Sequence, residues 1–160
     1  LRRGENGLGD LKMGEKVLFV NVFSDGFFTN SNLDILIGAL EGEGISIDSL
    51  DNPTDTDLKE KLPHYDAVSV NICHVPMSGS FDQIGAGFAQ SLWRIAHMYH
   101  DRVSYTCFGT PYVLHDLPHV PNMLLAYGAS ASVQHAIAKV WTGKLEPVGV
   151  LPVEESQVVY

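Results

Sequence analysis

The chain has 160 residues, of which 45% are hydrophobic and 18% are charged, and this composition is typical of a single globular domain rather than a disordered chain. Its 19 acidic residues outnumber its 10 basic residues, which gives a formal net charge of −9. Because nucleic-acid binding depends on Lys and Arg neutralising phosphates, this balance argues against a nucleic-acid partner. No apolar run approaches the roughly 20 residues that cross a bilayer, so no membrane span is predicted.

Residues 1–15 are rich in Gly and charge and have no clear period, which predicts a linker or an edge segment. The sequence starts with Leu1 rather than an initiator Met, and no apolar stretch of a secretory signal follows its first basic residues. We therefore expect the chain to be a piece of a longer protein. The compartment of that protein is left open.

The first half of the chain then alternates between short apolar runs and helical patterns. The run KVLFVNVF (16–23) is apolar at nearly every position, which favours a strand covered on both faces of a parallel sheet. The following spacing predicts a helix from about residue 32 to residue 43, capped by Asn30 or Ser31 and ended by Gly44. A strand at 45–50 and a short polar helix at 56–62, stopped by Pro63, come next.

The second half continues this alternation. A strand at 65–72 is followed by the longest helix, 81–99, and by a strand at 102–108. After a proline-rich loop, the sequence predicts a strand at 122–127, a helix at 130–142 capped by Ser130, and an extended segment at 147–153.

Alternating strands and helices require crossover connections, which produce a parallel sheet. We therefore predict an α/β fold: a three-layer sandwich with a mostly parallel, flavodoxin-like sheet and helices on both faces. The two cysteines, Cys73 and Cys107, each lie near the end of an apolar run, so we interpret them as reduced core thiols. A disulfide between neighbouring strand ends stays open at this point.

In an open parallel sheet, ligands bind beyond the carboxyl ends of the strands. The loops at those ends contain neither the dinucleotide fingerprint nor the phosphate-binding loop, and no Gly-x-Ser-x-Gly elbow occurs in the chain. Neither cysteine has a further ligand at metal spacing beside it. The sequence thus predicts no cofactor and no metal site.

Side chains that could line a cleft nevertheless occur in two of these loops. The loop at 73–82 offers His74 and Asp82, and the loop at 109–119 offers Tyr112, His115 and Asp116. We predict no catalytic residue among them, because the loops present too few acids, bases or nucleophiles for a complete catalytic site.

The second half of the chain resembles the C-terminal α/β sandwich domain of glycoside hydrolase family 3. The resemblance rests on the stretches FGTPYVLHDLPHVPNMLLAYGAS (108–130) and HAIAKVWTGKLEPVGVLPV (135–153). The second stretch ends in a Gly-x-x-x-Pro-x-Gly-x-Leu-Pro-Val tail, Gly143 to Val153. The sequence around Gly109-Thr110-Pro111-Tyr112 is most similar to the bacterial β-N-acetylhexosaminidase branch. The resemblance spans about residues 5–153.

The resemblance implies that residues 1–15 are a linker from a missing N-terminal catalytic barrel, residues 16–153 the C-terminal domain and residues 154–160 a tail. In that branch the nucleophilic Asp and the His-Asp acid/base pair lie on the barrel. In the β-glucosidase branch the C-terminal domain supplies a Glu acid/base, but the corresponding loop here, 73–82, contains no Glu. The implied partners are the barrel of the same parent chain and a carbohydrate at the interface.

Three hypotheses follow. The first is an accessory domain of such an enzyme, inactive in isolation. The second is a free-standing binding module of flavodoxin-like fold for a small ligand or a protein. The third is an independent enzyme that uses His115 and Asp116. A large apolar patch at one sheet end or on one helix face would favour the first over the second.

Overall fold

A computed structural model of the chain describes residues 11–23, 33–73, 86–98, 102–111 and 123–149. Within this part, five strands form one sheet in the order β2-β1-β3-β4-β5, and every neighbouring pair is parallel. The strands are β1 (Lys16–Phe23), β2 (Ser46–Asp51), β3 (Ala67–Cys73), β4 (Val103–Cys107) and β5 (Met123–Leu125). The predicted flavodoxin-like α/β fold is confirmed.

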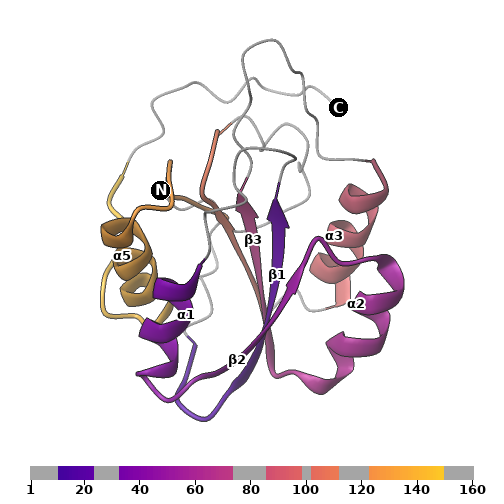
Figure 1. The fold of residues 1–160 in the computed structure, drawn as a ribbon, viewed down its shortest axis with the longest axis horizontal. Helices are drawn as coiled ribbons and strands as arrows, with labels where there is room; N and C mark the ends of the chain where they lie inside the picture. Colours follow the sequence, from indigo (N-terminus) through magenta and orange to yellow (C-terminus); the bar gives the residue numbers. More distant parts are fainter. Residues whose placement is uncertain (1–10, 24–32, 74–85, 99–101, 112–122, 150–160) are drawn as a thin grey trace.

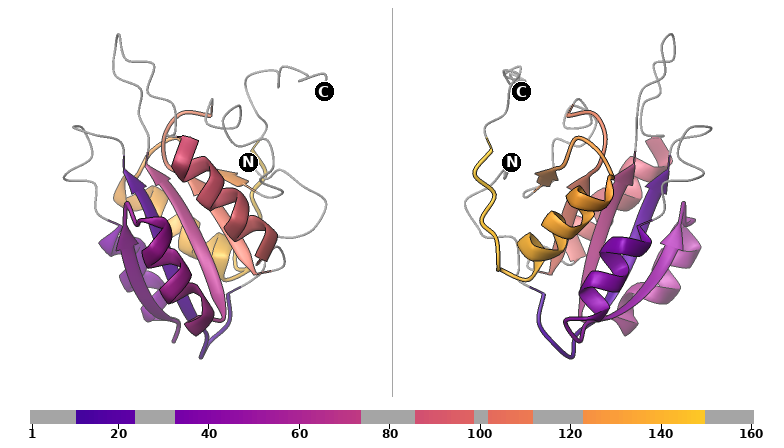
Figure 2. Two further views of the ribbon diagram at one scale, coloured as in Figure 1. Left: turned by 90° about the vertical axis from the view of Figure 1, so that its right-hand side faces the viewer. Right: turned by 60° about the vertical axis from the view of Figure 1, so that its left-hand side comes forward.

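Helices cover both faces of the sheet and complete three layers (Figures 1 and 2). Helices α1 (Asp34–Glu41) and α5 (Ala131–Trp141) lie on one face. Helices α2 (Asp55–Lys61) and α3 (Ala86–Met98) lie on the other, and the short 3-10 helix η1 (Leu62–His64) follows α2 directly. No helix in the described ranges is long and apolar enough to cross a membrane.

Each face of the sheet buries its own apolar core, because successive strand residues point to opposite faces. On the α2/α3 face, Leu92 and Ile95 of α3 pack on residues such as Tyr105. On the α1/α5 face, the largest buried side chains are Trp141, Phe19 and Phe108. The helical spacing predicts which side chains of each helix face the core. Eight of those that the structure describes are buried: Leu33, Leu36, Leu40, Leu92, Ile95, Ile137, Val140 and Trp141. Two others, Ile37 and Val133, are only partly buried.

The two cysteines project to opposite faces of the sheet. Cys73 belongs to the core under α1 and α5, whereas Cys107 belongs to the core under α2 and α3. Both are buried free thiols, which confirms the interpretation as reduced core residues. Burial raises the pKa of the Cys73 thiol to about 12 and that of the Cys107 thiol to about 11.

Two predictions about helix ends need correction. Ser130 occupies the N-cap position of α5, but its hydroxyl lies 3.1 Å from the Ser132 hydroxyl and makes no capping hydrogen bond. Pro63 does not stop the helical segment. It lies in the first turn of η1, where a missing N–H costs no hydrogen bond.

The prediction that Gly44 terminates the first helix is confirmed. The last residue of α1 is Glu41, and Gly44 follows with a φ of 80°, in the left-handed region that favours glycine. The Gly44 amide donates to the Glu41 carbonyl at 2.9 Å, and the Ile45 amide donates to the Leu40 carbonyl at 3.2 Å. The cap residues expected for the start of this helix, Asn30 and Ser31, lie outside the described residues.

The segment before β1 is attached to the body of the domain. The Leu11 amide donates to the Trp141 carbonyl oxygen at 2.8 Å, and the Leu11 side chain is buried. Arg102 forms an ion pair of 2.7 Å with Glu15. Residues 147–149, at the other end of the described part, form no strand, and residues 150–153 of the predicted extended segment lie outside it.

Candidate functional site

The strand order changes direction between β1 and β3. The connection through α1 leads from β1 to β2 at one edge, whereas β3, β4 and β5 extend the sheet the other way. In folds of this kind a crevice opens at such a point, beyond the carboxyl ends of the two strands, and ligands bind there. Figure 1 shows β1 and β3 side by side with their carboxyl ends pointing the same way. This end of the sheet is the candidate site.

A row of polar side chains crosses the sheet just below these carboxyl ends. The register pairs Asn21 of β1 with Asp51 of β2 and with Asn71 of β3, and it pairs Asn71 with Thr106 of β4. We call these four residues the polar row. Three of them are buried, with Asn21 4% exposed and Asn71 and Thr106 fully enclosed, whereas Asp51 reaches the surface.

Hydrogen bonds connect the polar row side chain to side chain. The Asn71 amide nitrogen donates to the Asn21 side-chain oxygen at 3.0 Å, and the Asn21 amide nitrogen donates to Asp51 Oδ1 at 2.8 Å. The Ser69 hydroxyl donates to the Asn71 side-chain oxygen at 3.3 Å. Because buried polar groups are costly unless they are paired, this chain of bonds fixes the relative positions of β2, β1 and β3.

The row ends at a group that is not satisfied. The Thr106 hydroxyl is fully buried and finds no hydrogen-bond partner among the described residues. Its register neighbour on the far side is the apolar Leu124 of β5. The hydroxyl therefore has no polar neighbour on that side of the row.

Asn52, directly after β2, ties down the end of β1. Its backbone amide donates to the Asn21 carbonyl at 2.7 Å, and its side-chain oxygen accepts from the Phe23 amide at 2.8 Å. Asn52 has a φ of 44°, in the left-handed region that Asn tolerates better than most residues. Asn52 thus holds the end of β1 by two hydrogen bonds, one to Asn21 and one to Phe23.

Gln134 of α5 is buried, with 3% of the residue exposed. Its oxygen accepts from the Leu36 amide of α1 at 3.0 Å, and its nitrogen donates to the Ala129 carbonyl at 2.8 Å. The side chain therefore links α1, α5 and the connection that follows β5. Nearby, Tyr127 is half exposed and has a φ of 58°.

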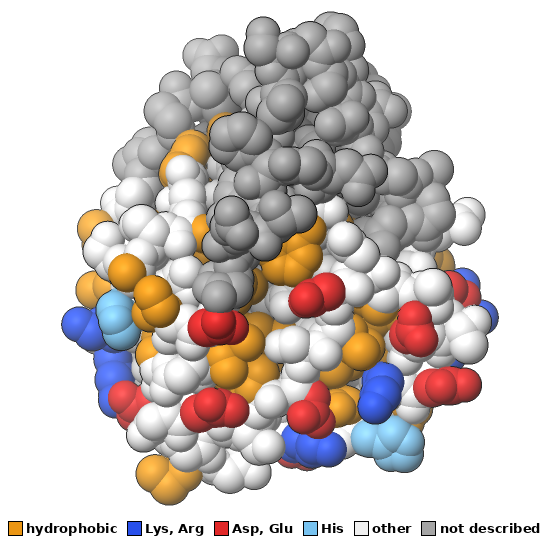
Figure 3. Space-filling model, viewed as in Figure 1, with side chains coloured by type: hydrophobic (Ala, Val, Ile, Leu, Met, Phe, Trp, Pro, Cys, Tyr) orange, Lys and Arg blue, Asp and Glu red, His pale blue; other side chains and the backbone are white. Residues whose placement is uncertain are grey.

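The described geometry of the polar row shows how the strand ends are positioned. The polar row has one carboxylate, Asp51, and its partner is an amide. The described ranges contain no cluster of three or more His, Cys, Asp or Glu side chains that could hold a metal ion. On the face shown in Figure 3, acidic side chains are spread among apolar ones over the described part, in keeping with the acidic balance of the sequence.

All five residues predicted from the sequence to line a cleft lie outside the described residues: His74, Asp82, Tyr112, His115 and Asp116. The structure describes the residues from which their loops depart, Cys73 at the end of β3 and Pro111 after β4. Whether these five side chains converge stays a prediction.

The sequence analysis missed the polar row because it treated the strands as continuous apolar runs. A signal was present, since Val20-Asn21-Val22 and Val70-Asn71-Ile72 repeat one pattern in two strands. An Asn between β-branched residues of a buried strand needs a hydrogen-bond partner. Two such strands at adjacent positions of a parallel sheet would supply it for each other.

Comparisons with known proteins locate this fold inside larger enzymes. No protein-family model matches the chain, and no curated protein matches it in sequence. A solved structure of a glycoside hydrolase family 3 β-N-acetylglucosaminidase from Paenibacillus sp. is similar over 94% of the chain, with a TM-score of 0.69 and 22% identity. The β-glucoside phosphorylase BglX is similar over 91% of the chain, with a TM-score of 0.56 and 18% identity.

A fungal multi-domain β-N-acetylglucosaminidase of glycoside hydrolase family 3 is also similar, over 85% of the chain with a TM-score of 0.59 and 16% identity. The chain spans only 29%, 27% and 15% of the lengths of these three proteins, respectively. At these identities the likeness is one of fold. The chain thus resembles a domain within glycoside hydrolase family 3 enzymes.

Proposed function

We propose that this chain is the accessory C-terminal α/β domain of a glycoside hydrolase family 3 enzyme of the β-N-acetylhexosaminidase type. The observation that carries the proposal is the pair of coverages in the Paenibacillus comparison. Nearly the whole chain, 94%, is similar to a part that makes up 29% of a longer β-N-acetylglucosaminidase. The Gly143 to Val153 tail of the sequence supports the same assignment.

In this proposal, residues 1–15 lead from an N-terminal catalytic barrel, residues 16–153 form the accessory domain, and residues 154–160 are a tail. The barrel is the partner, and the substrate is a carbohydrate held where the two domains meet. The loops that contain His74, Asp82, Tyr112, His115 and Asp116 leave the carboxyl end of the sheet and line that cleft. The polar row beneath them keeps the strand ends in register.

The isolated domain is inactive in this proposal. A retaining glycosidase needs two carboxyl groups about 5–5.5 Å apart, one as nucleophile and one as acid/base. In the described part of the candidate site, Asp51 faces the amide of Asn21 instead of a second carboxylate. The bond-breaking groups are therefore assigned to the barrel.

Two measurements test the proposal. The coding DNA upstream of Leu1 is expected to encode a barrel domain in the same reading frame. A stop codon or an unrelated domain there would contradict the proposal. The purified 160-residue chain is expected to release no nitrophenol from 4-nitrophenyl N-acetyl-β-D-glucosaminide, whereas the longer polypeptide is expected to release it.

A matched pair of variants separates this proposal from an independent enzyme. If the chain alone hydrolysed the substrate and His115→Gln abolished the activity, the site would be its own. The exposed His135 on α5 provides the control, since His135→Gln makes the same change at a residue outside these loops.

A further inference from the structure

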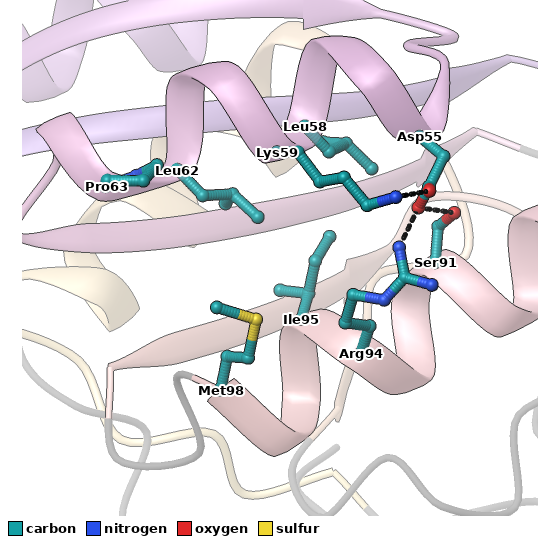
Figure 4. Close-up of a pocket in the computed structure, with 9 residues that line it drawn as sticks. All are labelled: Asp55, Leu58, Lys59, Leu62, Pro63, Ser91, Arg94, Ile95 and Met98. Carbon is teal, nitrogen blue, oxygen red and sulfur yellow. Dashed lines mark hydrogen bonds and ion pairs between the residues drawn. The ribbon is translucent and has the colours of Figure 1, made fainter.

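A groove lies between α2 and α3, on the side of the sheet opposite α1 and α5 (Figure 4). Its floor is apolar and is formed by Leu58, Leu62 and Ile95, each at most 3% exposed. Pro63 and Met98 line it as well, and its volume is about 80 Å³. None of its lining residues belongs to the polar row.

Charged side chains gather at one end of the groove. Asp55 accepts from Lys59 Nζ at 2.7 Å, from the Ser91 hydroxyl at 3.3 Å and from the Arg94 guanidinium. One carboxylate between two cations leaves a local charge of +1 on a chain whose net charge is −9. A guanidinium has five N–H donors, and the Arg94 side chain is 41% exposed, so a carboxylate arriving from solvent can also be bound there.

Helix α3 exposes two large side chains, Met98 at the groove and Trp93 elsewhere on the helix. Trp93 is 53% exposed and Met98 is 59% exposed. The Trp93 indole stacks on the His97 ring with parallel planes and centroids 5.5 Å apart. Trp, Met and Arg are the residue types enriched in the cores of protein interfaces, and Trp and Arg dominate binding hot spots.

The size of the groove distinguishes between kinds of occupant. Sites for small metabolites and cofactors enclose roughly 300–1,000 Å³ and surround most of the ligand. A hollow of about 80 Å³ is smaller, and it accommodates a single apolar side chain. Anchoring one side chain in a small pocket while the surrounding surface makes flat contact is how protein partners bind.

We propose that the α2–α3 groove is a docking surface for a protein partner that inserts one leucine-sized side chain and places an adjacent carboxylate against Arg94 and Lys59. The apolar floor receives the side chain. The local positive charge binds the carboxylate, and the exposed Met98 extends the contact along α3. This inference does not depend on the proposed glycosidase function, because it names the chemistry of the partner and not its identity.

A titration with blocked dipeptides tests the proposal. N-acetyl-leucyl-glutamate amide is added to the ¹⁵N-labelled chain, and the backbone amide shifts of Ser91, Arg94 and Met98 are followed. Saturable shifts confined to α2 and α3 are expected. The analogues N-acetyl-leucyl-glutamine amide and N-acetyl-alanyl-glutamate amide are each expected to bind about fivefold or more weakly, since each lacks one of the two recognised groups.

Variants of the chain give the reciprocal test. Arg94→Gln and Lys59→Gln are each expected to weaken binding of the leucyl-glutamate probe by about fivefold or more. Lys61→Gln removes the same charge from the same helix outside the groove and is expected to leave binding unchanged. The chemical-shift dispersion of each spectrum reports whether the variant is folded. If a variant does not fold, the comparison of the three probes on the unmodified chain still tests the proposal.

Three results would overturn the proposal. The first is the absence of saturable shifts at the groove. The second is equal binding of the glutamate and glutamine probes. The third is tighter binding of free 4-methylpentanoate than of the dipeptide, because the groove would then be a pocket for small apolar carboxylates and not a protein-docking surface.

Discussion

The side-chain amide of Asn71 donates to the side-chain oxygen of Asn21 at 3.0 Å, and both residues are buried. This bond joins β3 to β1 where the strand order changes direction, in addition to the backbone ladder between them. An amide pair in a buried sheet position tolerates only one register, because a shift by one residue would leave both amides unpaired. The pair therefore specifies how the two strands beneath the candidate site align.

Removing both members of this pair is expected to cost less than the sum of the two single removals. Asn71→Leu leaves the Asn21 oxygen buried without its donor, and we expect the free energy of unfolding to fall by about 1–3 kcal/mol. The double variant Asn21→Leu, Asn71→Leu should lose less than the sum of the two single changes. Urea unfolding followed by circular dichroism measures all four proteins. Gln90→Leu on the exposed face of α3 is the control, and strictly additive losses would contradict the coupling.

Thr106→Val is expected to keep or raise stability. Valine has nearly the shape of threonine, and the hydroxyl that it lacks is buried without a partner among the described residues. Relief of an unpaired polar group predicts a gain of about 1 kcal/mol in the free energy of unfolding. A loss of similar size, measured by the same urea titration, would show that the hydroxyl has a partner, such as a bound water molecule.

Both thiols are expected to resist modification in the folded chain and to form no disulfide with each other. With pKa values raised to about 12 for Cys73 and about 11 for Cys107, few thiolates exist at pH 8. Ellman's reagent should therefore detect two thiols in urea and almost none without it. Since the side chains lie on opposite faces of the sheet, oxidised samples should contain no intramolecular disulfide by mass spectrometry. Rapid labelling of the single variant Cys107→Ser in its native state would contradict this expectation for Cys73.

The hydrogen bond from Tyr65 to Asp48, 2.7 Å long, should make stability sensitive to alkaline pH. It raises the pKa of Tyr65 from 10.0 to about 12, and the same bond lowers the pKa of Asp48. A group with a raised pKa stabilises fully below its unfolded value, so this contribution is complete below pH 10 and is lost between pH 10 and 12. Tyr65→Phe should therefore show a shallower fall of the urea midpoint over that range.

Two further observations complete this test. The Asp48 carboxyl should titrate at a higher pH in Tyr65→Phe than in the parent chain, as followed by NMR. Tyr127→Phe, which changes an exposed tyrosine, should leave both measurements as they are. An unchanged midpoint profile in Tyr65→Phe would mean that the hydrogen bond does not form in solution.

The sheet was predictable because its strands are short, apolar and separated by helical patterns, as in Ala67–Cys73 and Val103–Cys107. The capping of the helices was less predictable than the sheet. Ser130 has the right residue type and position for a cap, yet its hydroxyl bonds to Ser132 instead. The capping box between Thr54 and Asp57 was missed, although it satisfies orphan groups of α2 in the standard way.

The candidate site was only partly predictable, for a physical reason. Its location follows from strand order, which an alternating sequence implies. The polar row, by contrast, depends on register between strands that are 30 to 50 residues apart in the chain, as the bonds of Asn21 to Asp51 and to Asn71 illustrate. Register is a property of tertiary pairing, so a linear pattern suggests which residues need partners but not which partner each one finds.

The hydrogen bond between the Leu11 amide and the Trp141 carbonyl also has a practical consequence. Leu11, the first described residue, therefore lies beside Trp141 in the last turn of α5. A folded segment whose two ends lie close together accepts circular permutation and insertion into the surface loops of a host. This α/β unit is accordingly suited to insertion between two positions of another protein that lie close together.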